Sequence, residues 1–179
     1  MLARAVANPD TIGCVPGDPT ANAALINRFY EAFARQDGDA MAACYTPDAH
    51  FHDPVFQDLN GDEVGSMWRM LCGRATDLKI VHSDVQADAD TGSAHWDADY
   101  TFSTGRAVHN PIDASFKFRD GLIADHRDDF DLYGWARQAL GPMGLLLGWS
   151  PPVQGKIRSQ AREGLDEFMA GEAAAHTTE

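Results

Sequence analysis

The chain has 179 residues, of which 44% are hydrophobic and 23% are charged, as in an ordinary globular domain rather than a disordered chain. Its 14 Lys and Arg residues against 27 Asp and Glu residues give a formal net charge of −13, which would repel a phosphate backbone. These values predict one folded domain, exclude a multidomain machine and argue against nucleic acid as a partner.

Cysteine content and hydropathy indicate where the protein works. The longest apolar run, Leu145–Leu147 with Trp149 nearby, is far shorter than the ~20 residues that span a bilayer. Polar and turn-forming residues at positions 8–13 interrupt any apolar stretch of signal-peptide length. The cysteines are odd in number and lack the close pairs of a zinc ribbon or a redox motif (Cys14, Cys44 and Cys72). We therefore expect a cytoplasmic protein without a membrane partner.

Three helices are predicted in the first half of the chain. The first starts near Thr20, carries apolar residues at helical spacing and stops at Asp37-Gly38. A short second helix over residues 39–45 ends before Pro47, because a residue that precedes proline avoids the helical region. A third follows Asn60-Gly61, with one apolar stripe formed by Val64, Met67, Trp68 and Leu71.

After Gly73 the pattern changes to strands separated by turn residues, and Asp120-Gly121 is a strong hairpin signal. Helices that precede a meander of strands predict an α+β domain with an antiparallel sheet rather than a parallel βαβ fold. The four predicted strands are Leu78–Gln86, Ala94–Ser103, Ala107–Phe118 and Leu122–Phe130.

The domain boundaries follow from the two ends of the chain. Residues 1–19 are rich in Pro and Gly without a periodic pattern, which predicts a flexible arm before a domain over residues 20–135. Residues 136–170 are predicted to form a helical extension, in which an amphipathic helix runs from Val153 to Met169. Residues 171–179 are predicted to be a disordered tail.

Asp53 is the first candidate for chemistry. It follows His50 and His52 and precedes Pro54, which pushes Asp53 out of the helical region and can present its carboxylate at a pocket mouth. The alternative is an aspartate that only caps a turn. Two histidines at this spacing suit some zinc sites, but spacing fixes no third ligand, so we expect no metal and no cofactor.

Polar residues within the predicted strands form the other candidate groups. Alternation places His126, Asp128 and Phe130 on one face of the last strand. In the second strand His95 and Asp97 alternate with apolar residues and can form a solvated outer row. Asn110 shares a face with Ile112, Phe116 and other apolar residues of the third strand, which predicts that its amide joins the buried side.

The order of several short segments resembles the nuclear transport factor 2-like superfamily. The segments are Arg28-Phe29-Tyr30, Asp39–Tyr45, Pro47-Asp48-Ala49 and Phe51–Val55. This superfamily includes ketosteroid isomerases, SnoaL-like polyketide cyclases and limonene-epoxide hydrolases, and the resemblance covers about residues 20–135. It implies a cone-shaped, cystatin-like fold, in which a strongly curved antiparallel sheet wraps around three helices and encloses a pocket, and it implies a homodimer.

The resemblance also implies roles for single residues. Asp53 is similar to the proton-shuttling base of the ketosteroid isomerases, whereas Phe29 stands where those enzymes have a tyrosine. Asp128 resembles the water-activating aspartate of the epoxide hydrolases, and the Arg-x-Asp pair of those enzymes falls on His95 and Asp97.

Together these residues predict a cofactor-free acid/base enzyme that acts on a small hydrophobic carbonyl compound or epoxide, as an isomerase, cyclase or hydratase. Asp53 would be the base, Asp128 a second acid or water positioner, and His126 a proton relay or donor. The residues expected to bind the substrate are Tyr30, Met67, Trp68, His95, Asp97, Asn110, Phe116 and Phe118.

Two other hypotheses stay open at this point. The first is a non-catalytic ligand-binding or dimerisation module, since a fold does not fix a function. The second is that the apolar residues Leu145–Trp149 and the helix that follows them bind a partner.

Overall fold

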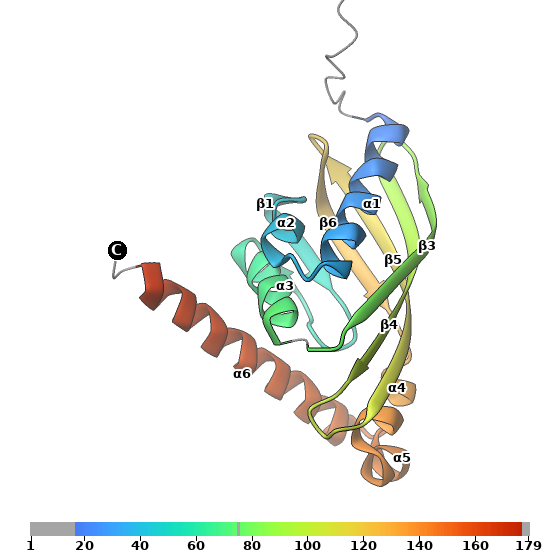
Figure 1. The fold of residues 1–179 in the computed structure, drawn as a ribbon, viewed down its shortest axis with the longest axis vertical. Helices are drawn as coiled ribbons and strands as arrows, with labels where there is room; N and C mark the ends of the chain where they lie inside the picture. Colours follow the sequence, from blue (N-terminus) through green and yellow to red (C-terminus); the bar gives the residue numbers. More distant parts are fainter. Residues whose placement is uncertain (1–16, 75, 177–179) are drawn as a thin grey trace, which may run out of the picture.

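A computed structural model describes residues 17–74 and 76–176 of the chain, and Figure 1 shows their arrangement. Six strands form one open sheet in the order β2-β1-β6-β5-β4-β3, which curves around the N-terminal helices. This is the expected α+β fold. The elements are α1 (Pro19–Ala34), α2 (Gly38–Ala42), β1 (Tyr45–His52), β2 (Leu59–Asn60), α3 (Asp62–Arg74), β3 (Lys79–Ala87), β4 (Thr91–Thr101), β5 (Ala107–Arg119), β6 (Leu122–Asp129), α4 (Leu132–Leu140), α5 (Pro142–Leu147) and α6 (Pro151–His176).

The first helix forms as its sequence predicts. The Asp18 side chain accepts a hydrogen bond from the backbone N–H of Thr20 at 2.8 Å, and Pro19 occupies the first turn, where its missing N–H costs nothing. Its apolar stripe is buried against the sheet and includes Leu25, Ile26, Phe29, Tyr30 and Phe33.

The second helix is shorter than predicted, and a strand follows it. Helix α2 ends at Ala42, and Tyr45 opens β1, which pairs in parallel with β6. Proline has no backbone N–H to donate to a neighbouring strand. Pro47 is tolerated in β1 because the pairing with β6 is irregular between Tyr45 and His50, so no hydrogen bond from this position is needed. Tyr45 therefore lies in the sheet and not at the end of a helix.

The meander β3–β6 confirms the predicted strands to within a few residues. Ala94, Trp96 and Ala98 of β4 are buried, and their neighbours point to the outer face. Asp120 and Gly121 have φ angles of 55° and 75°, as a tight turn between β5 and β6 requires.

The C-terminal extension closes one end of the molecule. Helices α4 and α5 lie at the lower end of β4 and β5 in Figure 1, and α6 runs back across α3. Leu165 of α6 is fully buried, so this helix belongs to the main core. Residues 171–176 are helical where a disordered tail was predicted, whereas residues 177–179 and most of the predicted arm lie outside the described residues.

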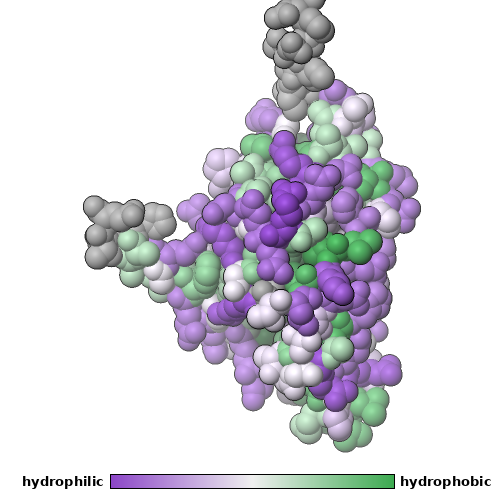
Figure 2. Space-filling view, in the orientation of Figure 1, coloured by the Kyte–Doolittle hydropathy of each residue, from purple (hydrophilic) through white to green (hydrophobic). Residues whose placement is uncertain are grey.

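The surface is mostly hydrophilic in the view of Figure 2, with one hydrophobic patch over β3 and further hydrophobic residues at the lower end around α5. Within the described residues, none of the helices combines the length and the apolar character needed to cross a bilayer. The exposed large hydrophobic side chains around α5 are Met143, Leu145, Leu146, Leu147 and Trp149.

Candidate functional site

A chain of buried hydrogen bonds joins four elements in the interior. The Trp68 Nε1 atom of α3 lies 3.0 Å from the Tyr45 hydroxyl, which lies 2.6 Å from Nδ1 of His126. On the other side of the ring, Nε2 of His126 lies 3.0 Å from Oδ1 of Asp128. The same oxygen accepts a hydrogen bond from Nε1 of Trp96 on β4 at 3.4 Å.

One assignment of the hydrogens satisfies every group of this chain. An indole N–H only donates, so Trp68 donates to the Tyr45 oxygen and leaves that hydroxyl able to donate onward. With a neutral imidazole, Nδ1 of His126 accepts from the Tyr45 hydroxyl and Nε2 donates to Oδ1 of Asp128.

Both ring nitrogens of His126 are engaged by other side chains of the interior. The residue has 0% exposure. Its ring centroid lies 4.3 Å from that of Phe116 and 5.1 Å from that of Phe51. His126 therefore acts as a link that positions Tyr45 and Asp128, rather than as a group that would touch a substrate.

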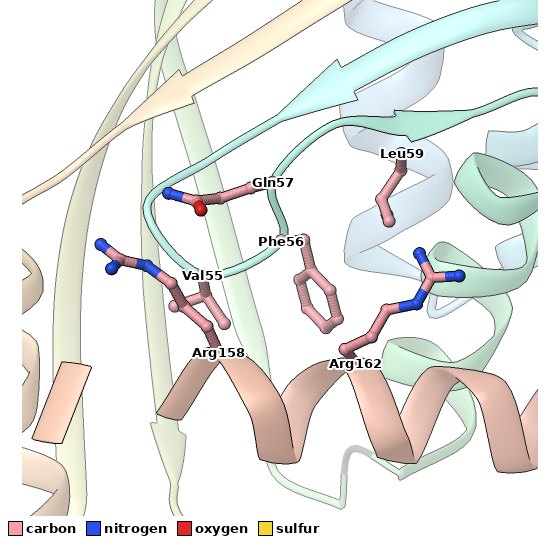
Figure 3. Close-up of a pocket in the computed structure, with 6 residues that line it drawn as sticks. All are labelled: Val55, Phe56, Gln57, Leu59, Arg158 and Arg162. Carbon is pink, nitrogen blue, oxygen red and sulfur yellow. The ribbon is translucent and has the colours of Figure 1, made fainter. Parts of the chain in front are cut away.

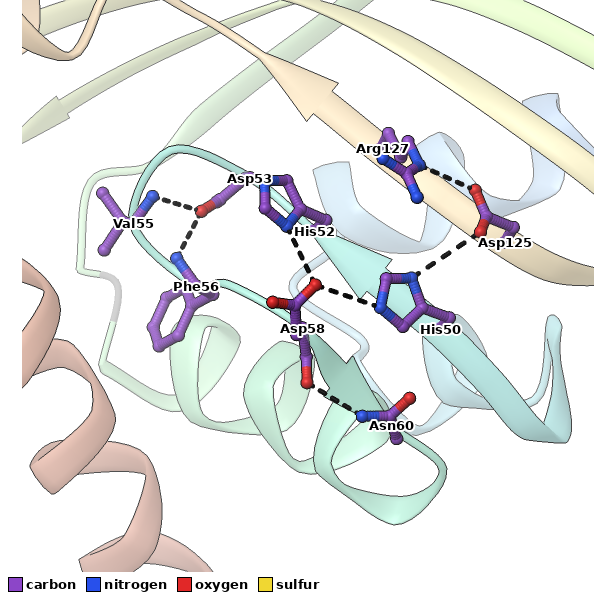
Figure 4. A network of polar contacts seen from close by, with 9 residues as sticks. All are labelled: His50, His52, Asp53, Val55, Phe56, Asp58, Asn60, Asp125 and Arg127. Carbon is purple, nitrogen blue, oxygen red and sulfur yellow. Dashed lines mark hydrogen bonds and ion pairs between the residues drawn. The ribbon is translucent and has the colours of Figure 1, made fainter.

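Asp53 lies in the loop that follows β1, at the edge of the interior (Figure 4). Its Oδ1 atom accepts backbone hydrogen bonds from Val55, at 2.6 Å, and from Phe56, so the carboxylate does cap a turn. Burial nevertheless raises the pKa of Asp53 to about 7, and the charge of Asp128 adds to the rise while the two backbone donors oppose it. Asp53 thus combines a turn-capping role with a titration near neutral pH.

Tyr30 carries the open polar group of the interior. Its hydroxyl is buried and has no hydrogen-bond partner among the described residues. Burial raises the pKa of Tyr30 well above its usual value, and the charge of Asp128 contributes to the rise. Its ring is stacked on that of His82, with the centroids 5.1 Å apart. Sequence reasoning treated Tyr30 only as part of a wall, and nothing local in the sequence marks its hydroxyl as unpaired.

The two tyrosines lead to opposite expectations for the same small change. Tyr45→Phe removes a hydroxyl that serves Trp68 and His126, and we expect it to lower the free energy of unfolding by about 1–3 kcal/mol. Tyr30→Phe removes an unsatisfied buried hydroxyl, and we expect unchanged or higher stability. Urea unfolding of both variants beside the wild type measures the contrast, and equal losses would contradict it.

Most of the other predicted site residues lie inside. Met67 and Trp68 of α3 and Phe116 of β5 are buried in the core, and Asn110 is on the same inner face. Phe118 is partly buried, with its ring stacked on that of Phe116. These aromatic and apolar side chains surround the buried hydrogen-bond chain.

His95 and Asp97 are wrongly predicted as substrate-binding residues. Because Trp96 between them faces the core, strand alternation places both on the outer face of the sheet. There Nδ1 of His95 lies 2.7 Å from Oδ1 of Asp113. Asp97 lies between His95 and His109 and pairs with both. This hydrogen bond to Asp113 raises the pKa of His95. The outer row stabilises the sheet surface and is separated from Asp128 by the sheet.

The two histidines before Asp53 meet a single carboxylate (Figure 4). Nε2 of His50 lies 3.5 Å and Nδ1 of His52 lies 3.4 Å from Oδ1 of Asp58, and Nδ1 of His50 lies 3.6 Å from Oδ2 of Asp125. Over residues 17–74 and 76–176, no group of three His, Cys, Asp or Glu side chains has an arrangement that could hold a metal ion.

A pocket of about 130 Å³ lies between the loop after Asp53 and helix α6 (Figure 3). The Phe56 ring lies between two arginines of α6 in this view. The residues that line the pocket are Val55, Phe56, Gln57, Leu59, Arg158 and Arg162.

Sequence reasoning missed Tyr45 and Arg158 as site residues. Tyr45 reaches His126 only because β1 pairs with β6, 81 residues further along the chain. The alternation of buried Ala49 and Phe51 with polar neighbours was the signal that could have revealed this strand. For Arg158, no local pattern points to the loop that it contacts.

Comparison with known proteins places the fold. A family model described as a SnoaL-like domain matches residues 26–126. An LEH-like epoxide hydrolase from M. tuberculosis is 21% identical with a TM-score of 0.59, over 72% of this chain and 94% of that one. A protein from Jannaschia sp. CCS1, provisionally named a SnoaL-like polyketide cyclase, is 18% identical with a TM-score of 0.60, over 69% and 94% of the two chains.

A third similar structure is that of a protein from Kribbella flavida, provisionally named a ketosteroid isomerase. It is 13% identical with a TM-score of 0.53, over 65% of this chain and 82% of that one. A search of curated proteins gave no match. At these identities the solved structures show a shared fold, which confirms the architecture that the resemblance implied.

Proposed function

The chain belongs to the SnoaL-like domain family, and this membership supports the binding of a small molecule. We propose that the protein is an acid/base enzyme that needs no cofactor. Its substrate would be a small hydrophobic carbonyl compound or epoxide. The observation that carries the proposal is Asp53, a partly buried carboxyl group whose pKa of about 7 lies near the pH at which the protein would work. A carboxyl group with the usual pKa of 3.8 would be a much weaker base.

Asp53 and Asp128 divide the work of proton transfer in this proposal. A general base is most effective when its pKa is close to the working pH, because it can then both take up and return a proton. Oδ1 of Asp53 is held by the two backbone N–H groups, which fix the orientation of the carboxyl group. The negative charge of Asp128, anchored by His126 and Trp96, helps to keep Asp53 protonated until the pH approaches 7.

Tyr30 supplies the donor that such a reaction needs. When a base removes a proton beside a carbonyl group, negative charge builds up on the carbonyl oxygen and requires a hydrogen-bond donor. The Tyr30 hydroxyl is buried and unpartnered among the described residues, and Asp128 influences the pKa values of both Tyr30 and Asp53. In this proposal Tyr30 donates to the developing oxyanion while Asp53 holds the proton.

Turnover of a panel of ketones and epoxides tests the proposal. Asp53→Asn keeps the shape and the turn cap but cannot take up a proton, so we expect kcat to fall by about 10²–10⁴-fold with ligand affinity retained. Asp113→Asn on the outer face is the matched control and should leave turnover unchanged. Absence of turnover for every compound, or turnover that Asp53→Asn leaves unchanged, would overturn the proposal.

A non-catalytic binding module is the second candidate. It is favoured by the hydrogen bonds of Asp53, which already satisfy a turn, and by the aromatic packing around His126. A ligand that copurifies, binds tightly and is never transformed would support this alternative over the enzyme.

We also propose a cytoplasmic homodimer. Free thiols at Cys44 and Cys72 are consistent with a reducing compartment. The exposed apolar side chains around α5, such as Leu146 at 67% and Trp149 at 63% exposure, would be covered by a second copy of the chain. Sedimentation velocity should give twice the mass of the chain, and Leu146→Ser with Trp149→Ser should shift it toward the monomer. A monomeric wild type would contradict this proposal.

A further inference from the structure

Arg158 presents an unpaired guanidinium group to a pocket of this otherwise acidic protein. Its Nε atom donates to the backbone carbonyl oxygen of Pro54 at 2.9 Å, which fixes the side chain against the loop. The two terminal nitrogens of the group have no hydrogen-bond or carboxylate partner among the described residues.

The second arginine of the pocket is different, because it is already neutralised. Arg162 lies 2.5 Å from Oε1 of Glu63 through its terminal nitrogen and 2.9 Å from Oδ1 of Asp166 through Nε. These contacts raise the pKa of Arg162. Of the two cations that line the pocket, Arg158 is therefore the one with free donors.

The remaining walls select against a purely polar ligand. Val55, Phe56 and Leu59 contribute apolar surface, and the Phe56 ring lies between the two arginines (Figure 3). A volume of about 130 Å³ equals roughly four water molecules at ≈ 30 Å³ each, enough for a short branched carbon chain with one polar group. The planar guanidinium fork matches the two oxygens of a carboxylate better than a single-point donor does.

We infer that this pocket binds the carboxylate of a small apolar acid, with Arg158 as the anion-binding residue and Val55, Phe56 and Leu59 around the carbon chain. Helix α6, which provides Arg158, follows the region that the family model matches, so the cationic wall of the pocket comes from outside that region. The inference does not depend on Asp53 being a base, because Asp53 is not among the residues that line the pocket.

Isobutyrate and its neutral counterpart isobutyramide are suitable probes, because they differ in charge and little in shape. Titration of the ¹⁵N-labelled full chain at constant ionic strength, followed by NMR, should show saturable shifts of the Val55, Phe56 and Gln57 amides with isobutyrate only. Arg158→Gln should weaken this binding at least tenfold, and Arg158→Lys should weaken it less because the charge is kept. Lys156→Gln removes one charge from an exposed position of the same helix and should leave the affinity unchanged.

Several outcomes would overturn the inference. They are equal binding of acid and amide, unchanged affinity in Arg158→Gln, an equal loss in Lys156→Gln, and the absence of saturable shifts at 50 mM isobutyrate. The NMR spectrum of each variant reports its folding directly, and the Arg158→Lys variant keeps the test decisive if Arg158→Gln does not fold.

Discussion

Replacement of His126 by alanine is expected to lower the free energy of unfolding by roughly 4 kcal/mol. The imidazole joins the Tyr45 hydroxyl to the Asp128 carboxylate in a region without exposed surface, and its removal leaves both groups without this partner. A buried carboxylate that loses a donor costs more than the hydrogen bond itself is worth in water, because no water replaces the donor. A cavity beside Phe51 and Phe116 adds to the loss.

Urea denaturation at constant pH measures this loss. His109→Ala is the matched control, because His109 is 58% exposed on the outer face and its contacts with Asp97 and Asp99 are open to water. We expect the control to change stability by less than about 0.5 kcal/mol. A loss below 1 kcal/mol for His126→Ala would show that the buried chain does not hold the interior together.

Asp53→Asn should make the protein more stable at neutral and alkaline pH. The pKa of Asp53 is about 7 in the folded state against an ordinary value of 3.8. Between these two values the folded state binds more protons than the unfolded state, so the wild type loses stability as the pH rises from about 4 through 7. An asparagine does not titrate, yet it keeps the carbonyl oxygen that caps the turn to Val55 and Phe56.

The difference between the two proteins is therefore expected to grow with pH. A shift of this size corresponds to as much as about 4 kcal/mol well above pH 7, with partial exposure of the side chain reducing it. Urea unfolding at pH 5, 6, 7 and 8 gives the two stability curves. Curves that stay parallel over this range would show that Asp53 titrates in the folded protein as it does in the unfolded chain.

Local patterns of the sequence were sufficient for much of the fold. Helical spacing from Leu25 to Phe33 and strict alternation around Trp96 each fixed which face of an element is buried. For β1 the alternation of Ala49 and Phe51 with polar neighbours was a signal too, but Pro47 argues against a strand unless the register shift beside it is known. Such a shift depends on pairing with β6, which no local pattern reveals.

Strand alternation predicts which site residues share a face, but it cannot predict contacts between elements that are far apart in the sequence. Alternation correctly placed His126 and Asp128 on the same face of β6, and the structure shows that this face is the inner one. The same rule favoured an outer position for His95 and Asp97, and the resemblance to epoxide hydrolases led to the wrong side of the sheet. The role of Tyr45 follows only from its tertiary contacts with Trp68 and His126.

The state of Tyr30 is a further result that only the packed structure reveals. Helical spacing predicted a buried ring, and the ring is fully buried on α1. Whether its hydroxyl finds a partner depends on β4 and β6, which supply Trp96 and Asp128. A pattern along one helix carries no information about donors and acceptors on other elements.

The protonation of Asp53 is the most direct test of the proposed acid/base chemistry. Carboxyl ¹³C resonances of the uniformly labelled protein can be followed from pH 3 to 9, with Asp53→Asn identifying the signal. We expect a midpoint of about 7 for this carboxyl group, and a smaller value when Asp128 is replaced by asparagine, because the neighbouring charge is then lost. A midpoint near 4 that does not respond to Asp128→Asn would contradict this expectation.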